Sequence, residues 1–128
     1  MIYGIGTDIV EIARIRASLE KHGSRFAERI LAESELQAYL THDQKPHFLA
    51  KRYAAKEAAA KAFGTGFRDG LSLRHIIVTS GVMGKPELHF EHAAKALEQQ
   101  CGIGASHLSL SDEQHYAIAY VVLESRNI

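Results

Sequence analysis

A helix-forming run from Pro46 to Phe63 is the feature that most limits how this chain folds. Proline suits the first helical turn, nearly every later residue favours helix, and Gly64 is of the type that commonly ends one. Alanines at positions 54, 55, 58, 59, 60 and 62 leave little side-chain bulk on this run, so neighbouring backbone can approach it closely. The sequence therefore predicts a long central helix.

The remaining segments alternate between helical and strand-like patterns, with no long linker or repeat. Strands are predicted at Ile2–Val10, His75–Ser80, Glu87–Phe90, His107–Ser111 and Tyr116–Glu124, and shorter helices at Glu11–His22, Ser24–Leu31, Ser34–Leu40 (Ser34 as N-cap) and Glu91–Gln100. We expect one α+β domain over residues 1–128, with a small, mainly antiparallel sheet packed against the helices.

Composition excludes several functional classes. Lys+Arg and Asp+Glu both number 15, so we expect neither a nucleic-acid nor a membrane binder, which normally shows a basic excess. No apolar stretch is long enough to cross a bilayer, and the N-terminus lacks a basic leader. A lone Cys101 agrees with a reducing compartment, and we expect a cytoplasmic protein.

The stretch from residue 14 to residue 29, called the basic stretch below, carries Arg14, Arg16, Lys21, Arg25 and Arg29 against only two glutamates. One interpretation is a solvated helix face. The other is a surface on which an acidic partner docks.

Glu57 and Lys61 lie four residues apart in the central helix, so their side chains share one face. One interpretation is a surface ion pair that supports the helix, which is the more frequent reason for this spacing. The other is that both side chains belong to one functional site.

Asp8 is an acid in an otherwise apolar strand that carries Gly4 and Gly6, where a carboxylate needs a partner. It either caps the following helix, with Glu11 completing a capping box, or meets Glu57. Two carboxylates and water form the sparse oxygen site that magnesium prefers when it also binds phosphates, and Lys61 would neutralise those phosphates.

Other motifs give weaker or no evidence of function. Ile9 occupies the third glycine position of a dinucleotide fingerprint, so that motif is rejected. His89 and His92 have no further ligands in a zinc pattern, and no nucleophile elbow or cysteine-nucleophile signature is present.

Four segments together resemble the bacterial holo-acyl-carrier-protein synthases, in order and over nearly the whole chain. They are Gly4–Ile12, Phe48–Gly66, Gly84–Pro86 and Leu108–Ala117. The resemblance implies a magnesium-dependent transferase that moves the 4′-phosphopantetheine arm of coenzyme A onto a serine of acyl carrier protein, in support of fatty acid biosynthesis. It also implies a homotrimer with coenzyme A bound between subunits.

The resemblance also implies roles for individual residues. Asp8 and Glu57 match the family's metal-binding acids and Lys61 its phosphate-contacting lysine, and these three are the expected catalytic residues. Arg14, Lys21 and Arg25 fall on the helical region that receives the carrier protein. The residues that match positions on or beside the coenzyme site are Arg52, Lys61, Gly64, Gly84, Pro86 and, at a position where many members have histidine, Asp112.

Several points stay open at this stage. The base that takes the serine proton is either Glu57 or a water molecule on the metal, and Asp112, His115 or neither replaces the family's histidine. The preferred carrier, the tolerance for acyl-coenzyme A and the turnover rate are not encoded in any motif. Two rival functions share some of these features: a non-catalytic module that binds an acidic protein, and an enzyme that transfers phosphate from a nucleoside triphosphate.

Overall fold

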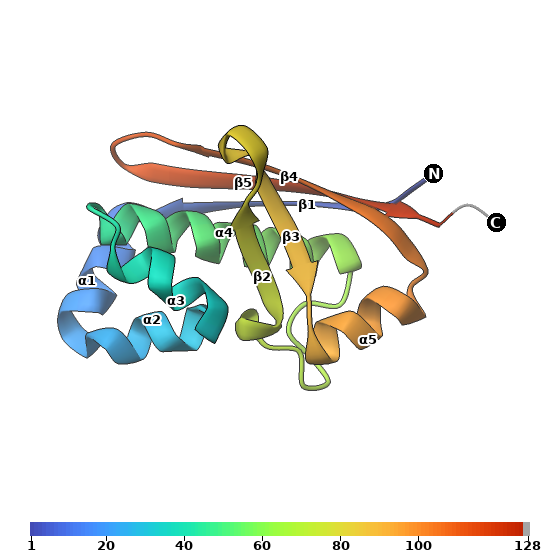
Figure 1. Ribbon diagram of the computed structural model, residues 1–128, viewed down its shortest axis with the longest axis horizontal. Coiled ribbons are helices and arrows are strands. Elements are labelled where there is room, and N and C mark those ends of the chain that lie inside the picture. The colour runs from blue at the N-terminus through green and yellow to red at the C-terminus, as the bar shows by residue number, and fades with distance from the viewer. Residues whose placement is uncertain (127–128) are drawn as a thin grey trace.

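Two antiparallel sheets and five α-helices make up the computed structural model, which describes residues 1–126. The larger sheet has the strand order β1 (Ile2–Glu11), β5 (Tyr116–Ser125) and β4 (Ile103–Asp112), and the smaller one is the hairpin of β2 (Ile76–Ser80) and β3 (Pro86–Phe90). The helices are α1 (Ile12–His22), α2 (Ser24–Ile30), α3 (Glu33–Leu40), α4 (Lys45–Phe63) and α5 (His92–Gln100). Helix α4 runs under the larger sheet, and the β2–β3 hairpin lies across α4 and beside β4 (Figure 1).

Close packing between β1 and α4 depends on the two glycines of β1. A Cβ atom at Gly4 would lie 2.0 Å from the carbonyl oxygen of Ala62, and one at Gly6 would lie 2.0 Å from that of Ala58. Because strand side chains alternate between faces, Asp8 points to this same side of β1. The glycines therefore bring the Asp8 carboxylate down to the helix that carries Glu57.

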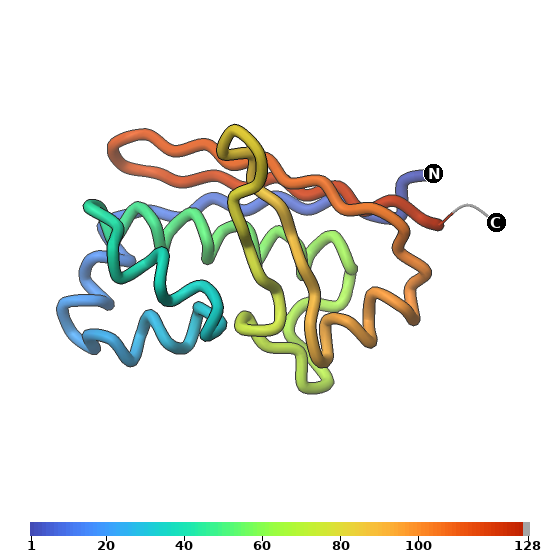
Figure 2. Tube along the Cα trace, in the orientation of Figure 1, coloured from blue at the N-terminus to red at the C-terminus, as the bar shows by residue number. Residues whose placement is uncertain are grey.

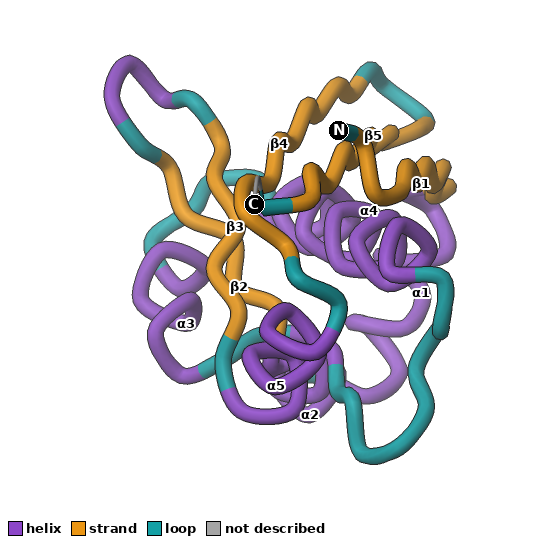
Figure 3. Tube along the Cα trace, turned by 90° about the vertical axis from the view of Figure 1, so that its right-hand side faces the viewer, coloured by secondary structure: helices purple, strands orange, loops and turns teal. Residues whose placement is uncertain are grey.

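The larger sheet has one covered and one uncovered face, as Figure 3 shows. Ala117, Ala119, Val121 and Leu123 of β5 face α4 and are fully buried. The β4–β5 hairpin extends over the first turns of α4 (Figure 2), where Lys51 Nζ lies 3.7 Å from Asp112 Oδ1. Among residues 1–126, no helix is long and apolar enough to cross a membrane.

The predicted α+β class and the long central helix are confirmed, with corrections in detail. The strands form two sheets rather than one, and β4 begins at Ile103 instead of His107. Helix α3 is capped at Ala32, whose backbone N–H donates to Glu35 Oε1 at 2.8 Å, so the Ser34 cap was wrong. Glu11, rather than Asp8, is the N-cap residue of α1, and its side chain makes no cap hydrogen bond, so the alternative in which Asp8 caps this helix was wrong.

Candidate active site

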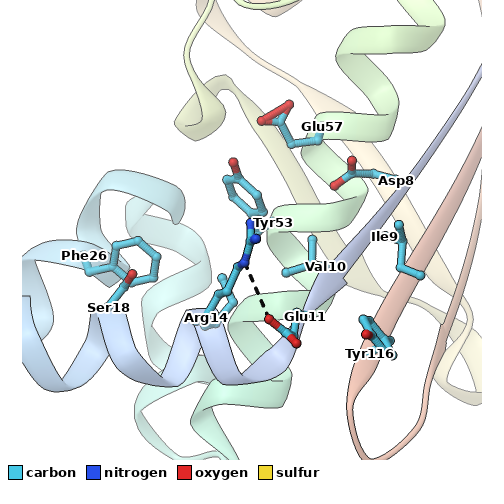
Figure 4. Close-up of a pocket in the computed structure, with 11 residues that line it drawn as sticks. Asp8, Ile9, Val10, Glu11, Arg14, Ser18, Phe26, Tyr53, Glu57 and Tyr116 are labelled. Atoms are coloured by element: carbon cyan, nitrogen blue, oxygen red, sulfur yellow. Dashed lines mark ion pairs between the residues drawn. The ribbon is translucent and has the colours of Figure 1, made fainter.

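A cavity of about 630 Å³ lies at the junction of β1 and α1, next to α4 (Figure 4). It holds three of the predicted site residues, Asp8, Glu57 and Arg14. Segments distant in the sequence therefore bring these three side chains to one cavity, which Glu11 also lines. Its lining consists of Asp8, Ile9, Val10, Glu11, Arg14, Ile15, Ser18, Phe26, Tyr53, Glu57 and Tyr116.

Lys61 lies at the edge of this arrangement and holds Asp8 in place. Its Nζ donates to Asp8 Oδ1 at 3.1 Å and to the backbone carbonyl of Thr7 at 2.9 Å. The Asp8 side chain is 17% exposed, whereas that of Lys61 is 55% exposed. Lys61 therefore pairs with Asp8 on β1 rather than with Glu57 on its own helix.

The donor set of the cavity fits magnesium. Mg²⁺ in proteins commonly uses one or two carboxylates and fills its remaining positions with water and phosphate oxygens. Asp8 and Glu57 supply two carboxylates, and among residues 1–126 no group of three or more His, Cys, Asp and Glu side chains is placed to enclose a metal ion. An open site with two protein ligands suits a metal shared with a substrate better than a closed structural metal centre.

The basic stretch borders the cavity. Arg14 lines it, with its Nε 3.5 Å from Glu11 Oε1, and Lys21 and Arg25 are exposed farther along α1 and α2. Ile12 and Ile15 anchor α1 in the core, which leaves its charged side in solvent.

The other predicted coenzyme residues lie outside this cavity. Gly64 ends α4 in the left-handed conformation, and Gly84 precedes Lys85 at the tip of the β2–β3 hairpin. Pro86 lines a separate cavity of about 300 Å³ between that hairpin and β4. Asp112 is the last residue of β4, paired with Lys51.

Arg52 has a structural partner. It is 9% exposed, and its Nη1 donates to Glu35 Oε2 at 3.0 Å while its guanidinium lies over the Phe48 ring. In the single chain Arg52 is therefore part of the helix packing, and its predicted contact with coenzyme A finds no support in this placement.

Ser18, Phe26 and Tyr53 are among the cavity side chains that sequence reasoning missed. Burial raises the pKa of Tyr53, and the Glu57 and Asp8 carboxylates raise it further. A signal for Tyr53 was present, because it precedes Glu57 by four residues on α4 and so shares its face. No such signal exists for Phe26, which reaches the cavity through the packing of α2.

A family model and the sequences of known proteins place the chain in the same family. Residues 4–121 match the model of the 4′-phosphopantetheinyl transferase superfamily. A holo-[acyl-carrier-protein] synthase from Hamiltonella defensa is 52% identical over 123 residues, covering 96% of this chain and 98% of that protein.

Solved structures agree with this family. A holo-[acyl-carrier-protein] synthase from Neisseria meningitidis has a TM-score of 0.93 and 45% identity, covering 98% of this chain and 100% of that one. A holo-(acyl-carrier-protein) synthase from Bacillus anthracis, solved in complex with CoA (3′,5′-ADP), has a TM-score of 0.83 and 39% identity, covering 98% and 99%.

Proposed function

The chain belongs to the 4′-phosphopantetheinyl transferase superfamily, and we propose that the cavity holding Asp8 and Glu57 is where it transfers the 4′-phosphopantetheine group of coenzyme A to a serine of acyl carrier protein. One observation carries the proposal: β1 and α4 bring these two carboxylates into one cavity, and the basic stretch borders it. A site for a metal-bound pyrophosphate thus adjoins a surface suited to an acidic protein.

In the proposed reaction the serine oxygen attacks phosphorus in the pyrophosphate of coenzyme A. The new bond joins serine to phosphopantetheine, and the P–O bond to the departing adenosine 3′,5′-bisphosphate breaks. Such transfers depend mainly on positioning and charge neutralisation. When bound, magnesium supplies positive charge against the pyrophosphate oxygens.

The chain's own residues would then act as follows. Asp8 and Glu57 hold the metal, and Lys61, on the rim beside Asp8, offsets negative charge that moves to the leaving nucleotide. Among residues 1–126 Asp8 forms an ion pair with Lys61 and Glu11 forms one with Arg14, whereas Glu57 forms none, which favours Glu57 as acceptor of the serine proton.

Arg14, Lys21 and Arg25 receive the carrier protein in this proposal. They are exposed on α1 and α2, and Arg14 reaches the cavity itself. Attraction between this basic surface and an acidic carrier helix would bring the carrier serine toward Glu57.

We further propose a homotrimer, with one domain per chain, in the cytoplasm. The uncovered face of the larger sheet exposes large apolar side chains, which suits a subunit interface. The number three rests on the family resemblance. In such an assembly Gly84, Pro86 and Asp112 of a neighbouring chain would complete the coenzyme site. The exposed apolar residues are Ile5, Ile9, Ile118 and Tyr120, each more than 40% exposed.

Intact-mass analysis of an apo acyl carrier protein tests the function. With this protein, coenzyme A and magnesium, the carrier should gain one phosphopantetheinyl group, and chelation of magnesium or Glu57→Ala should abolish the gain. A carrier that binds without magnesium and keeps its mass would indicate a binding module. Modification that requires a nucleoside triphosphate in place of coenzyme A would indicate an enzyme that transfers phosphate from that nucleotide.

A further inference from the structure

The two carboxylates of the proposed metal site, Asp8 and Glu57, differ in whether a cation of the protein holds them. Asp8 is held by Lys61 Nζ at 3.1 Å, so its carboxylate has a fixed partner. The Glu57 carboxylate has no ion pair with any cation of residues 1–126. Its side chain has three rotatable bonds, and no ion pair fixes its rotamer. A metal ligand of this kind loses rotamer freedom on binding unless a neighbour already orients it.

Tyr53 is the polar neighbour that faces Glu57. The two residues lie on successive turns of α4, four residues apart, and both line the cavity. Figure 4 shows the Tyr53 hydroxyl directed toward the Glu57 carboxylate.

The chemistry of Tyr53 suits a donor. A tyrosine phenol keeps its proton at neutral pH and can therefore act as a donor. A phenol can donate one hydrogen bond to a carboxylate, and bonds to charged acceptors are stronger than neutral ones.

We propose that Tyr53 is a positioning residue whose hydroxyl donates a hydrogen bond to Glu57 and holds that carboxylate toward Asp8, ready to bind the metal. This inference rests on the proposed function, because it assigns Glu57 to the metal. Tyr53 touches neither the metal nor the reacting atoms. It acts through Glu57 by reducing the freedom that this side chain loses when the site is loaded.

Tyr53→Phe tests the role with a single-atom change, because phenylalanine keeps the ring that packs in the cavity and removes only the hydroxyl. Magnesium binding is measured by calorimetry on the protein with coenzyme A and no carrier, so turnover does not enter. We expect Tyr53→Phe to weaken magnesium binding by about tenfold. The magnesium concentration for half-maximal transfer should rise in parallel, while the KM for the carrier stays the same.

Tyr39→Phe is the matched control. It makes the same chemical change at a tyrosine of α3 that is 6% exposed and outside the cavity, so magnesium binding should not change.

A double-mutant cycle separates positioning from stability. In a Glu57→Gln background the further change Tyr53→Phe should have little effect on the residual magnesium binding, since the charged acceptor is gone. An equal loss in both backgrounds would overturn the proposal, as would unchanged magnesium affinity in Tyr53→Phe. A rise in carrier KM alone would also overturn it, because the hydroxyl would then contact the carrier. If the wild-type protein fails to modify the carrier, the proposed function fails instead.

Discussion

Glu35 anchors the part of α4 that carries Glu57. It is 2% exposed, and its carboxylate accepts from Lys56 Nζ at 2.5 Å and from Arg52 Nη1 at 3.0 Å. The backbone N–H of Val78 also donates to it at 3.1 Å. Burial lowers the pKa of Lys56 to about 8, although the Glu35 carboxylate opposes this shift. One buried acid thus joins α3, α4 and β2.

Glu35→Gln should destabilise the protein by about 3 to 5 kcal/mol, because it leaves the buried charges of Arg52 and Lys56 without their carboxylate. Urea unfolding measures this free energy. Glu33→Gln removes an exposed carboxylate from the same helix and should cost less than about 0.5 kcal/mol. Equal effects of the two changes would show that the buried network contributes little.

Lys61→Ala should reduce transfer by at least about tenfold through loss of the positive charge beside the leaving nucleotide. Lys61→Arg should restore transfer only in part, since a planar guanidinium does not match the contacts of Nζ with Asp8 and Thr7. Initial rates of carrier modification measure both, with Lys95→Ala, an exposed lysine of α5, as control. Full activity of Lys61→Ala would show that Lys61 has no role in transfer and is only a residue of the helix surface.

At the scale of elements, the contact between β1 and α4 determines where Asp8 lies. Gly6→Ala should destabilise the fold by at least about 2 kcal/mol, because the added methyl group collides with backbone of Ala58 and neither element moves without disturbing the core. Gly70→Ala is a control without collision, in which the left-handed backbone alone costs about 1 kcal/mol. Thermal unfolding compares them. A Gly6→Ala protein as stable as Gly70→Ala would contradict the close packing.

The basic stretch on α1 and α2 has its own test. Arg14→Glu combined with Arg25→Glu should raise the KM for the carrier by about tenfold or more at low salt and leave coenzyme A binding unchanged, because charge reversal replaces attraction by repulsion. The difference from wild type should shrink as salt rises. Lys95→Glu on α5 serves as control. Weaker coenzyme binding with an unchanged carrier KM would mean that the stretch serves the nucleotide.

Local patterns in the sequence predicted most elements and the two carboxylates. Alanines and flanking Pro46 and Gly64 predicted α4, and the conflict of Asp8 with its apolar strand made Asp8 a candidate site residue. Local patterns could not predict the first residues of β4, where Gly104 and Ala105 lack strand preference and pairing with the end of β5 decides the conformation. They also could not show that Arg52 pairs with Glu35 or that Phe26 reaches the cavity, because both depend on tertiary packing.

For the molecule as a whole, the uncovered sheet face predicts assembly. Light scattering should give the mass of three chains. Ile118→Glu, which places a charge in the middle of the apolar face, should dissociate them. Leu40→Glu changes an exposed leucine at the end of α3, away from that face, and should leave the mass unchanged. A monomeric mass at full transfer activity would rule out the proposed trimer.

The location of the reaction is the central claim, and a crystal structure with coenzyme A and magnesium bound tests it most directly. We predict the metal between the carboxylates of Asp8 and Glu57, in contact with the pyrophosphate, with Lys61 beside the nucleotide and Gly84 and Pro86 contributed by a neighbouring chain. A pyrophosphate bound away from both carboxylates, for example in the cavity between the β2–β3 hairpin and β4 of one chain, would contradict it.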